Sequence, residues 1–183
     1  NGNYVNGVGY ALATLGDSPL LPTHLRADYL AIAERLLARL EALFAAARHT
    51  AIRLHGDCHP GNLLERDGSF HLVDLDDCRM GPALQDLWML LAGERQERLR
   101  QLAELADGYQ EFHDFPSHEL PLLEGLRSLR LLHHSAWLAR RWDDPAFPPA
   151  FPWFGTEHYW RQQIGLLREQ LAALDEEPLR LYG

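Results

Sequence analysis

Apolar residues recur every three to four positions along four stretches of this chain. Because that period places side chains on one face of an α-helix, it predicts helices over residues 24–48, 94–114, 117–142 and 156–174. The residues expected to face the interior of the first three helices are Leu25, Tyr29, Ile32, Leu36, Leu40 and Leu43, then Leu99, Leu102, Leu105, Ala106, Tyr109 and Phe112, then Leu122, Leu123, Leu126, Leu129, Leu132 and Leu138.

Three further stretches lack this period. Residues 82–92 are apolar on nearly every side, which predicts a buried helix at the centre of the fold, with Pro82 in its first turn. Residues 143–153 contain four prolines and are not expected to form regular structure. Residues 1–23 are expected to form an irregular connector with a turn of helix near 8–15, since they carry Gly, Asn and Pro.

Short apolar runs separated by turn residues predict strands between the first and second helices. Residues 52–54 form one candidate strand, and 63–65 and 70–73 form two more. Asp67-Gly68 lies between the last two, and this dipeptide is a strong signal for a hairpin. Residues 55–62 and 76–82 are expected to be loops. The fold class is therefore mainly α with a small β-hairpin.

Composition excludes several classes of protein. The formal net charge is −9, and there is no basic stripe, so we expect no nucleic-acid partner. No apolar run has the length of a membrane span, and no signal peptide is visible. The two cysteines do not make a disulfide framework, which favours a cytoplasmic location. The length of 183 residues is typical of one domain.

The candidate chemistry gathers in the predicted loop and hairpin. Asp57 and Asn62 lie five positions apart in the loop, and Asp74 follows the hairpin that returns the chain toward them. An amide and a carboxylate oxygen can share a Mg²⁺ ion with substrate phosphates. Asp57 is then left to accept a proton from a substrate hydroxyl. This division of roles is the one found in phosphoryl transfer by kinases.

The motifs HGDCHPGN, VDLDD and GPALQDLW resemble the aminoglycoside phosphotransferase and choline kinase branch of the protein-kinase-like fold. The loop follows the kinase pattern H-R-D-x-x-x-x-N, with Gly56 in place of Arg. The resemblance covers roughly residues 20–180. It implies an ATP-dependent enzyme in which Asp57 is the catalytic proton acceptor, and Asn62 and Asp74 bind magnesium.

The same resemblance assigns supporting roles and an architecture. It implies that His55 braces the backbone near Asp74, and that Asp86 is a buried acid at a helix start that accepts hydrogen bonds from loop amides. Asp76 is a candidate supporting acid near the metal; the alternative for Asp76 and Asp77 is a solvated loop. The implied fold is the C-terminal, helical lobe over residues 24–183, with a catalytic loop at 55–62 and a metal-binding segment at 74–77.

One absence affects the domain organisation. All 17 basic residues are arginine, whereas kinases of this fold use a strand lysine to hold the nucleotide phosphates. Neither that lysine nor a glycine-rich loop in a strand context can be found. We therefore expect residues 1–23 to connect to an N-terminal lobe outside this chain, and we expect the chain alone to have little activity. The intact protein is expected to be a monomer.

More than one class of acceptor fits these motifs. The segments around Arg140-Arg141-Trp142 and Phe151-Pro152-Trp153 resemble a bacterial Ser/Thr protein kinase of this branch, which implies a protein substrate. The alternatives are a small-molecule kinase acting on an amino sugar, choline or homoserine, and a non-catalytic interaction lobe. Only eleven residues separate Asp74 from Asp86, which is too short for a long activation loop, so we expect no switch of that kind.

A transition-metal site is the alternative interpretation of the two histidines in this loop. His55, Asp57 and His59 alternate, and alternation on a strand would place them on one face. Gly56 and Pro60 argue against a strand, and no third nitrogen or sulfur ligand is near in the sequence. Cys58 is a candidate redox-sensitive thiol, although a small packed residue is the more common role for such a cysteine.

Overall fold

The computed structural model describes residue 9 and residues 12–181, and the chain divides into two compact units. The first unit comprises Asn1–Ala46 and Arg127–Glu176, and the second comprises Ala47–Leu126 and Glu177–Gly183. Of the predicted connector, residue 9 and residues 12–17 are helical, in agreement with the turn of helix expected near 8–15. Residues 1–8, 10 and 11 lie outside the described residues.

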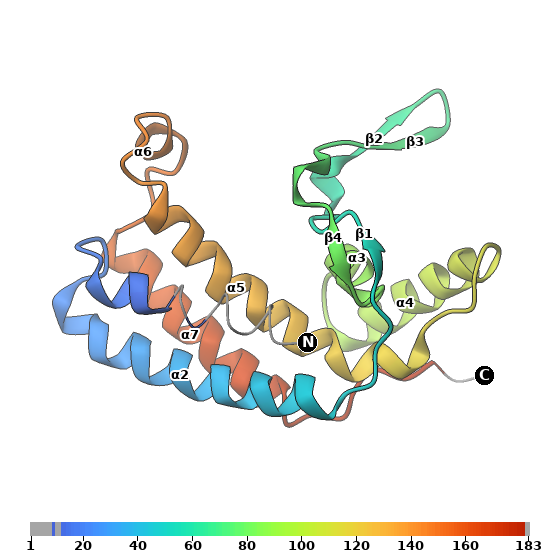
Figure 1. Ribbon diagram of the computed structural model, residues 1–183, viewed down its shortest axis with the longest axis horizontal. Coiled ribbons are helices and arrows are strands. Elements are labelled where there is room, and N and C mark those ends of the chain that lie inside the picture. The colour runs from blue at the N-terminus through green and yellow to red at the C-terminus, as the bar shows by residue number, and fades with distance from the viewer. Residues whose placement is uncertain (1–8, 10–11, 182–183) are drawn as a thin grey trace. The chain divides into compact units, whose positions relative to one another are not determined.

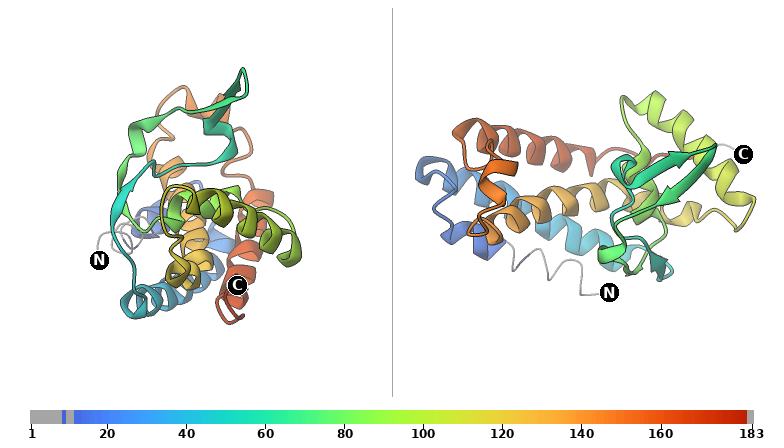
Figure 2. Two further views of the ribbon diagram at one scale, coloured as in Figure 1. Left: turned by 90° about the vertical axis from the view of Figure 1, so that its right-hand side faces the viewer. Right: turned by 90° about the horizontal axis from the view of Figure 1, so that it is seen from above.

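Three long helices, which lie side by side, build the first unit (Figures 1 and 2). They are α2 (Thr23–Ala46), α5 (Leu123–Arg140) and α7 (Glu157–Ala173), and α5 belongs to this unit from Arg127 onward. All three were predicted from the apolar period, although α5 begins later than expected. Buried leucines such as Leu36 and Leu132 line their shared interior. Burial of each such side chain stabilises the folded state by about 1.5–3 kcal/mol relative to exposure.

Aromatic side chains join α2 to α7. The rings of Tyr29 and Trp160 meet edge to face with centroids 5.0 Å apart, and both are fully buried. The indole Nε1 of Trp160 donates to the carbonyl oxygen of Leu20 at 2.6 Å. On α5, the Ser135 hydroxyl lies 2.8 Å from the Tyr159 hydroxyl. The buried polar groups of Trp160 and Tyr159 are thus satisfied within the first unit, as burial requires.

The start of α7 confirms one predicted cap, and the segment before it corrects another prediction. Thr156 is the N-cap, and its Oγ1 accepts a hydrogen bond from the Tyr159 amide. Residues 143–153 were expected to be irregular, but they contain the short helix α6 (Phe147–Ala150). Its prolines occupy the first helical turn, where a missing N–H leaves no hydrogen bond unmade.

Two antiparallel pairs of strands form the β-structure of the second unit. β2 (Leu63–Arg66) pairs with β3 (Ser69–Leu72), and the turn between them contains Asp67 and Gly68, both with positive φ. The predicted hairpin is therefore confirmed. β1 (Ile52–Leu54) pairs with β4 (Arg79–Gly81). β4 falls in the predicted loop 76–82, so that part of the prediction was wrong. Its three residues form a strand only because β1 supplies a partner from earlier in the chain.

The predicted helix over 82–92 is also wrong as a single element. The structure has a one-turn helix α3 (Leu84–Leu87) followed by a 3-10 turn (Trp88–Leu90). The Leu91 amide bonds to the Trp88 carbonyl, three residues back, so the last turn tightens and the helix ends. Gly93 then takes a positive φ. Only some of the apolar side chains of this segment are buried, among them Leu84 and Trp88.

The remaining helices of the second unit agree with the prediction in place but not in length. α4 spans Arg95–Gln110, and Glu94 and Glu97 form a capping box at its start. Phe112, predicted to face the interior, lies beyond the end of α4 and is 89% exposed. The chain enters α5 through a 3-10 segment, Ser117–Leu122, because Pro121 cannot continue an α-helical hydrogen-bond pattern. The six leucines predicted to be inward over 117–142 are all buried.

None of the described helices is both long and apolar enough to cross a membrane.

Candidate active site

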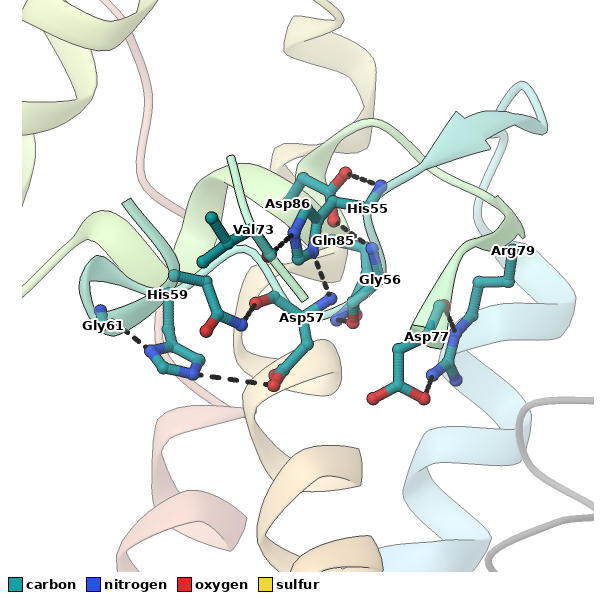
Figure 3. A network of polar contacts seen from close by, with 11 residues as sticks. His55, Gly56, Asp57, His59, Gly61, Val73, Asp77, Arg79, Gln85 and Asp86 are labelled. Atoms are coloured by element: carbon teal, nitrogen blue, oxygen red, sulfur yellow. Dashed lines mark hydrogen bonds and ion pairs between the residues drawn. The ribbon is translucent and has the colours of Figure 1, made fainter. Parts of the chain in front are cut away.

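The loop between β1 and β2 is held by the carboxylate of Asp86, in α3. The backbone amide of His55 donates to Asp86 Oδ2 at 2.6 Å, and that of Gly56 donates to Oδ1 at 2.9 Å (Figure 3). These are the contacts expected for Asp86 from the resemblance, although the side chain is half-buried rather than buried. Charge-assisted bonds to two successive amides fix the start of the loop against α3.

His55 joins the loop to the strand end that precedes Asp74. Its Nε2 lies 2.8 Å from the carbonyl oxygen of Val73, and its Nδ1 lies 3.3 Å from the amide of Asp57. A carbonyl oxygen can only accept, so Nε2 carries the proton and Nδ1 accepts from Asp57. The imidazole thus braces the backbone on both sides. Because both ring nitrogens are engaged, His55 is not placed to ligate a transition metal.

Asn62 is buried beneath the loop. Its side-chain Nδ2 donates to the backbone carbonyl oxygen of Asp57 at 3.0 Å, and its backbone carbonyl accepts from the Val73 amide at 3.1 Å. The side chain is 8% exposed. Asp57, Asn62 and the residue preceding Asp74 are thus joined by direct hydrogen bonds, so the structure brings the three predicted segments together.

Asp74 lies at the end of the hairpin in a left-handed conformation, with φ 61° and ψ 64°. It is exposed, as are Asp76 and Asp77 in the following 3-10 turn (Leu75–Asp77). Asp77 pairs with Arg79, whose terminal nitrogen lies 2.9 Å from Asp77 Oδ1. For Asp77, the solvated loop that was the alternative prediction is what the structure contains.

The oxygen donors of this region suit a hard divalent cation. Because the Asn62 amide donates through Nδ2, its Oδ1 remains as an acceptor, and Asp74 adds a carboxylate. Magnesium sites in enzymes that act on phosphates combine one or two such groups with waters and substrate phosphates. Within residue 9 and residues 12–181, no group of three or more His, Cys, Asp or Glu side chains could hold a metal ion. The groups that Asn62 and Asp74 offer are of the oxygen types that Mg²⁺ binds.

Gly56 is required by the backbone of the loop. Its φ is +89°, a conformation that side-chain-bearing residues rarely adopt. A Cβ atom there would overlap the carbonyl oxygen of Asp77 and lie 3.0 Å from Arg79 Nε. The close approach of the segment after Asp74 therefore leaves no room for a side chain at position 56.

Two neighbouring side chains lie against Asp57. His59 accepts from the Gly61 amide through Nδ1, and its Nε2 lies 3.6 Å from Asp57 Oδ2. Cys58 is buried, and burial together with the charges of Asp86 and Asp57 raises the pKa of its thiol. A raised pKa keeps the thiol protonated and poorly reactive, so the structure favours the packed-residue interpretation over a redox role.

The sequence interpretation missed one acid of the second unit. Glu119 is 1% exposed, and its carboxylate accepts from two backbone amides. One is that of Thr50, just before β1, and the other is that of Leu84, the first residue of α3. A glutamate at the start of an apolar run, before Leu120 and Leu122, was the only signal for it in the sequence. Such a residue is usually exposed, so only the folded chain identifies it.

Comparisons with known proteins point to one family. A family model described as the phosphotransferase enzyme family matches residues 13–122. Stress response kinase A of Escherichia coli (strain K12) is 48% identical over 165 residues, which are 90% of this chain and 50% of that protein. The serine/threonine protein kinase RdoA of Salmonella typhimurium is 46% identical over the same length and shares. The chain therefore spans about half the length of the curated relatives that it matches.

A solved structure supports the same fold. The spectinomycin phosphotransferase crystallised with ADP and spectinomycin has a TM-score of 0.51 and 15% sequence identity to this chain. The match covers 92% of this chain and 51% of that one. At this identity the likeness concerns the fold alone, and it agrees with the predicted kinase-like architecture, mostly helical with small antiparallel sheets.

Proposed function

The chain belongs to the phosphotransferase enzyme family, and from that premise we propose that the intact protein transfers the γ-phosphoryl group of ATP to a hydroxyl group. The observation that carries the proposal is the network around Asp57. Asp86 and His55 hold the backbone of the loop, and Asn62 bonds to the Asp57 carbonyl beneath it. Enzymes that transfer phosphoryl groups depend chiefly on such positioning.

In this proposal Asp57 accepts the proton of the attacking hydroxyl. Its carboxylate is half-buried, and the bonds to its amide and carbonyl orient the residue from both sides. Asn62 and Asp74 would hold Mg²⁺, which supplies charge neutralisation at the phosphates when it is bound. His55 and Asp86 support the loop, and Asp76 is a supporting acid beside Asp74.

We propose that the acceptor is a Ser or Thr hydroxyl of a protein. This rests on the names of relatives that are 46–48% identical over 90% of this chain, stress response kinase A and the serine/threonine protein kinase RdoA. A small-molecule acceptor is the second candidate. The solved neighbour, a spectinomycin phosphotransferase, favours it, but its identity to this chain is only 15%. The greater similarity to the protein kinases favours the first.

We further propose that residues 24–183 correspond to the C-terminal lobe of the kinase-like fold, and residues 1–23 to its connector. Three observations support this. The chain matches about half of the length of its relatives. Its sequence also contains no lysine that could hold the nucleotide phosphates. In addition, Phe70 and Leu72 are 74% and 51% exposed on one face of the hairpin, where a further lobe would cover them. The complete protein would act in the cytoplasm as a monomer.

Two measurements test the proposal. Calorimetric titration of ATP, with and without Mg²⁺, would compare this chain with the full-length protein; binding that depends on Mg²⁺ and appears only in the full-length form supports a split nucleotide site. Transfer of labelled γ-phosphate would then be measured to Ser/Thr peptides and to an amino-sugar and choline panel. Transfer to peptides alone supports the protein kinase, transfer to a small molecule alone supports the second candidate, and transfer to neither supports a non-catalytic lobe.

A further inference from the structure

Glu119 joins two segments that lead into the candidate active site. It lies in the 3-10 segment Ser117–Leu122, where its side chain is 1% exposed. Oε1 accepts from the amide of Thr50 at 3.1 Å, and Oε2 accepts from the amide of Leu84 at 3.1 Å. Each oxygen of the carboxylate is thus used by a backbone donor from a different segment.

Those two segments carry the residues that hold the loop. Thr50 lies two positions before β1, which runs directly into His55. Leu84 is the first residue of α3, which contains Asp86. Asp86 in turn accepts from the amides of His55 and Gly56. Glu119 and Asp86 therefore join the β1 segment to α3 at two places, one before the strand and one after it.

A carboxylate side chain suits this contact. It can accept at both oxygens, whereas an amide would turn its own N–H groups toward one of the two backbone donors. Burying a charge is costly, and a well-packed apolar residue often stabilises a fold equally well. The charge of Glu119 also contributes, after burial itself, to a raised pKa of the Tyr109 phenol. A buried carboxylate at this position is thus explained better by the two backbone segments it aligns than by stability.

We propose that Glu119 is a positioning residue of the phosphotransferase site, which acts through Thr50 and Leu84 to hold β1 against α3 and so set the position of the loop that carries Asp57. The inference rests on the proposed function for its effect on turnover. Its effect on the backbone of the loop does not depend on that function.

Glu119→Gln is the informative variant, because it keeps the volume of the side chain and replaces one acceptor by a donor. Glu124→Gln is the matched control: Glu124 lies five residues further along and pairs with Arg98 of α4 at 2.8 Å. In the full-length protein, hydrogen exchange of the amides at 52–57 should be faster in Glu119→Gln and unchanged in Glu124→Gln. Exchange equal to the wild type in both variants would overturn the proposal.

Turnover provides the second readout. With both variants folded at the assay temperature, Glu119→Gln should lower kcat by about 10- to 100-fold, because small misplacements of a catalytic group are costly. KM for MgATP should change by less than about threefold, since ligands of the nucleotide are untouched. Glu119→Asp, which keeps two acceptors, should recover part of kcat and also serves if Glu119→Gln does not fold. Equal losses of kcat in Glu119→Gln and Glu124→Gln would contradict positioning. A wild type that transfers no phosphate would instead refute the proposed function, and the exchange measurement would still decide the role of Glu119.

Discussion

His55 Nε2 donates a hydrogen bond to the carbonyl oxygen of Val73 at 2.8 Å, across 18 positions of the chain. This bond joins the loop that contains Asp57 to the strand end that precedes Asp74. The Val73 amide also donates to the Asn62 carbonyl, so the same residue is held from two sides. The proposed roles of Asp57, Asn62 and Asp74 all depend on this junction, and they lead to the following predictions.

Replacing Asp57 should remove the proposed proton acceptor without removing nucleotide binding. In the full-length protein, Asp57→Asn is expected to lower kcat by about 10²- to 10⁴-fold, the usual contribution of a general base. Affinity for MgATP, measured by calorimetry, should equal that of the wild type within experimental error. Asp67→Asn, at the exposed turn of the hairpin, is the control and should keep wild-type turnover. Wild-type kcat in Asp57→Asn would show that another group accepts the proton.

Replacing Asp74 should weaken nucleotide binding only when magnesium is present. Asn tolerates the left-handed backbone that Asp74 adopts, so Asp74→Asn changes the charge with little strain. Affinity for ATP in Mg²⁺ should fall by at least about tenfold, by analogy with losses at metal sites. Affinity in EDTA should equal that of the wild type, which serves as the internal control. An equal loss under both conditions would argue against a metal ligand.

A side chain at Gly56 should destabilise the second unit. Gly56→Ala combines a positive φ with an overlap between Cβ and the Asp77 carbonyl, and strain of this kind costs about 1–3 kcal/mol. Gly68→Ala is the matched control, because Gly68 has φ +76° but nothing within 4 Å of its Cβ position. Urea unfolding should therefore give a larger loss for Gly56→Ala. Equal losses would mean that the segment after Asp74 moves away without cost.

Tyr159 should make the first unit sensitive to alkaline pH. Burial raises its pKa from 10.0 to about 12, against a smaller opposing effect of the Ser135 hydrogen bond. The folded state therefore stays protonated where the unfolded state ionises. Stability is complete below pH 10 and is lost as pH rises through about 12. For a shift of this size the loss is about 2–3 kcal/mol.

Tyr159→Phe tests this pH dependence. At pH 7 the variant should be less stable by about 1 kcal/mol, because the bond to Ser135 is lost. Between pH 10 and 12 its stability should fall less than that of the wild type. Part of the dependence of stability on pH should persist in the variant, because burial also raises the pKa of the Tyr29 phenol. Urea unfolding at several pH values measures both effects, and an unchanged slope would exclude Tyr159 as a source.

The exposed hairpin face should make this chain self-associate. Phe70 and Leu72 lie on the same face of β3, opposite Glu65 and Leu63, and both are exposed. Exposed contiguous apolar surface promotes association. Sedimentation at high concentration should show oligomers for the wild-type chain, and Phe70→Ser with Leu72→Ser should reduce them. Phe112→Ser, which removes a ring that is even more exposed, at 89%, after the end of α4, should not reduce them. A wild-type chain that stays monomeric would count against the prediction.

Much of this protein can be read from its sequence, because its signals are local. The period of apolar residues located α2, α4, α5 and α7, and Asp67-Gly68 located the hairpin. The spacing of Asp57, Asn62 and Asp74 located the candidate site, because loop chemistry there depends on residue type and order. The structure brings those segments together by the hydrogen bonds of His55, Asn62 and Val73.

Features that depend on distant partners were decided only by the tertiary structure. β4 exists because β1 pairs with it, the segment 82–92 breaks into two turns, and Phe112 lies beyond the helix that was expected to bury it. The carbonyl of Asp77 approaches Gly56 so closely that no Cβ fits there, and the buried carboxylate of Glu119 is satisfied by the amides of Thr50 and Leu84. Residue type and spacing specify what a segment can form, whereas backbone donors and acceptors from elsewhere in the chain determine which of these forms is stable.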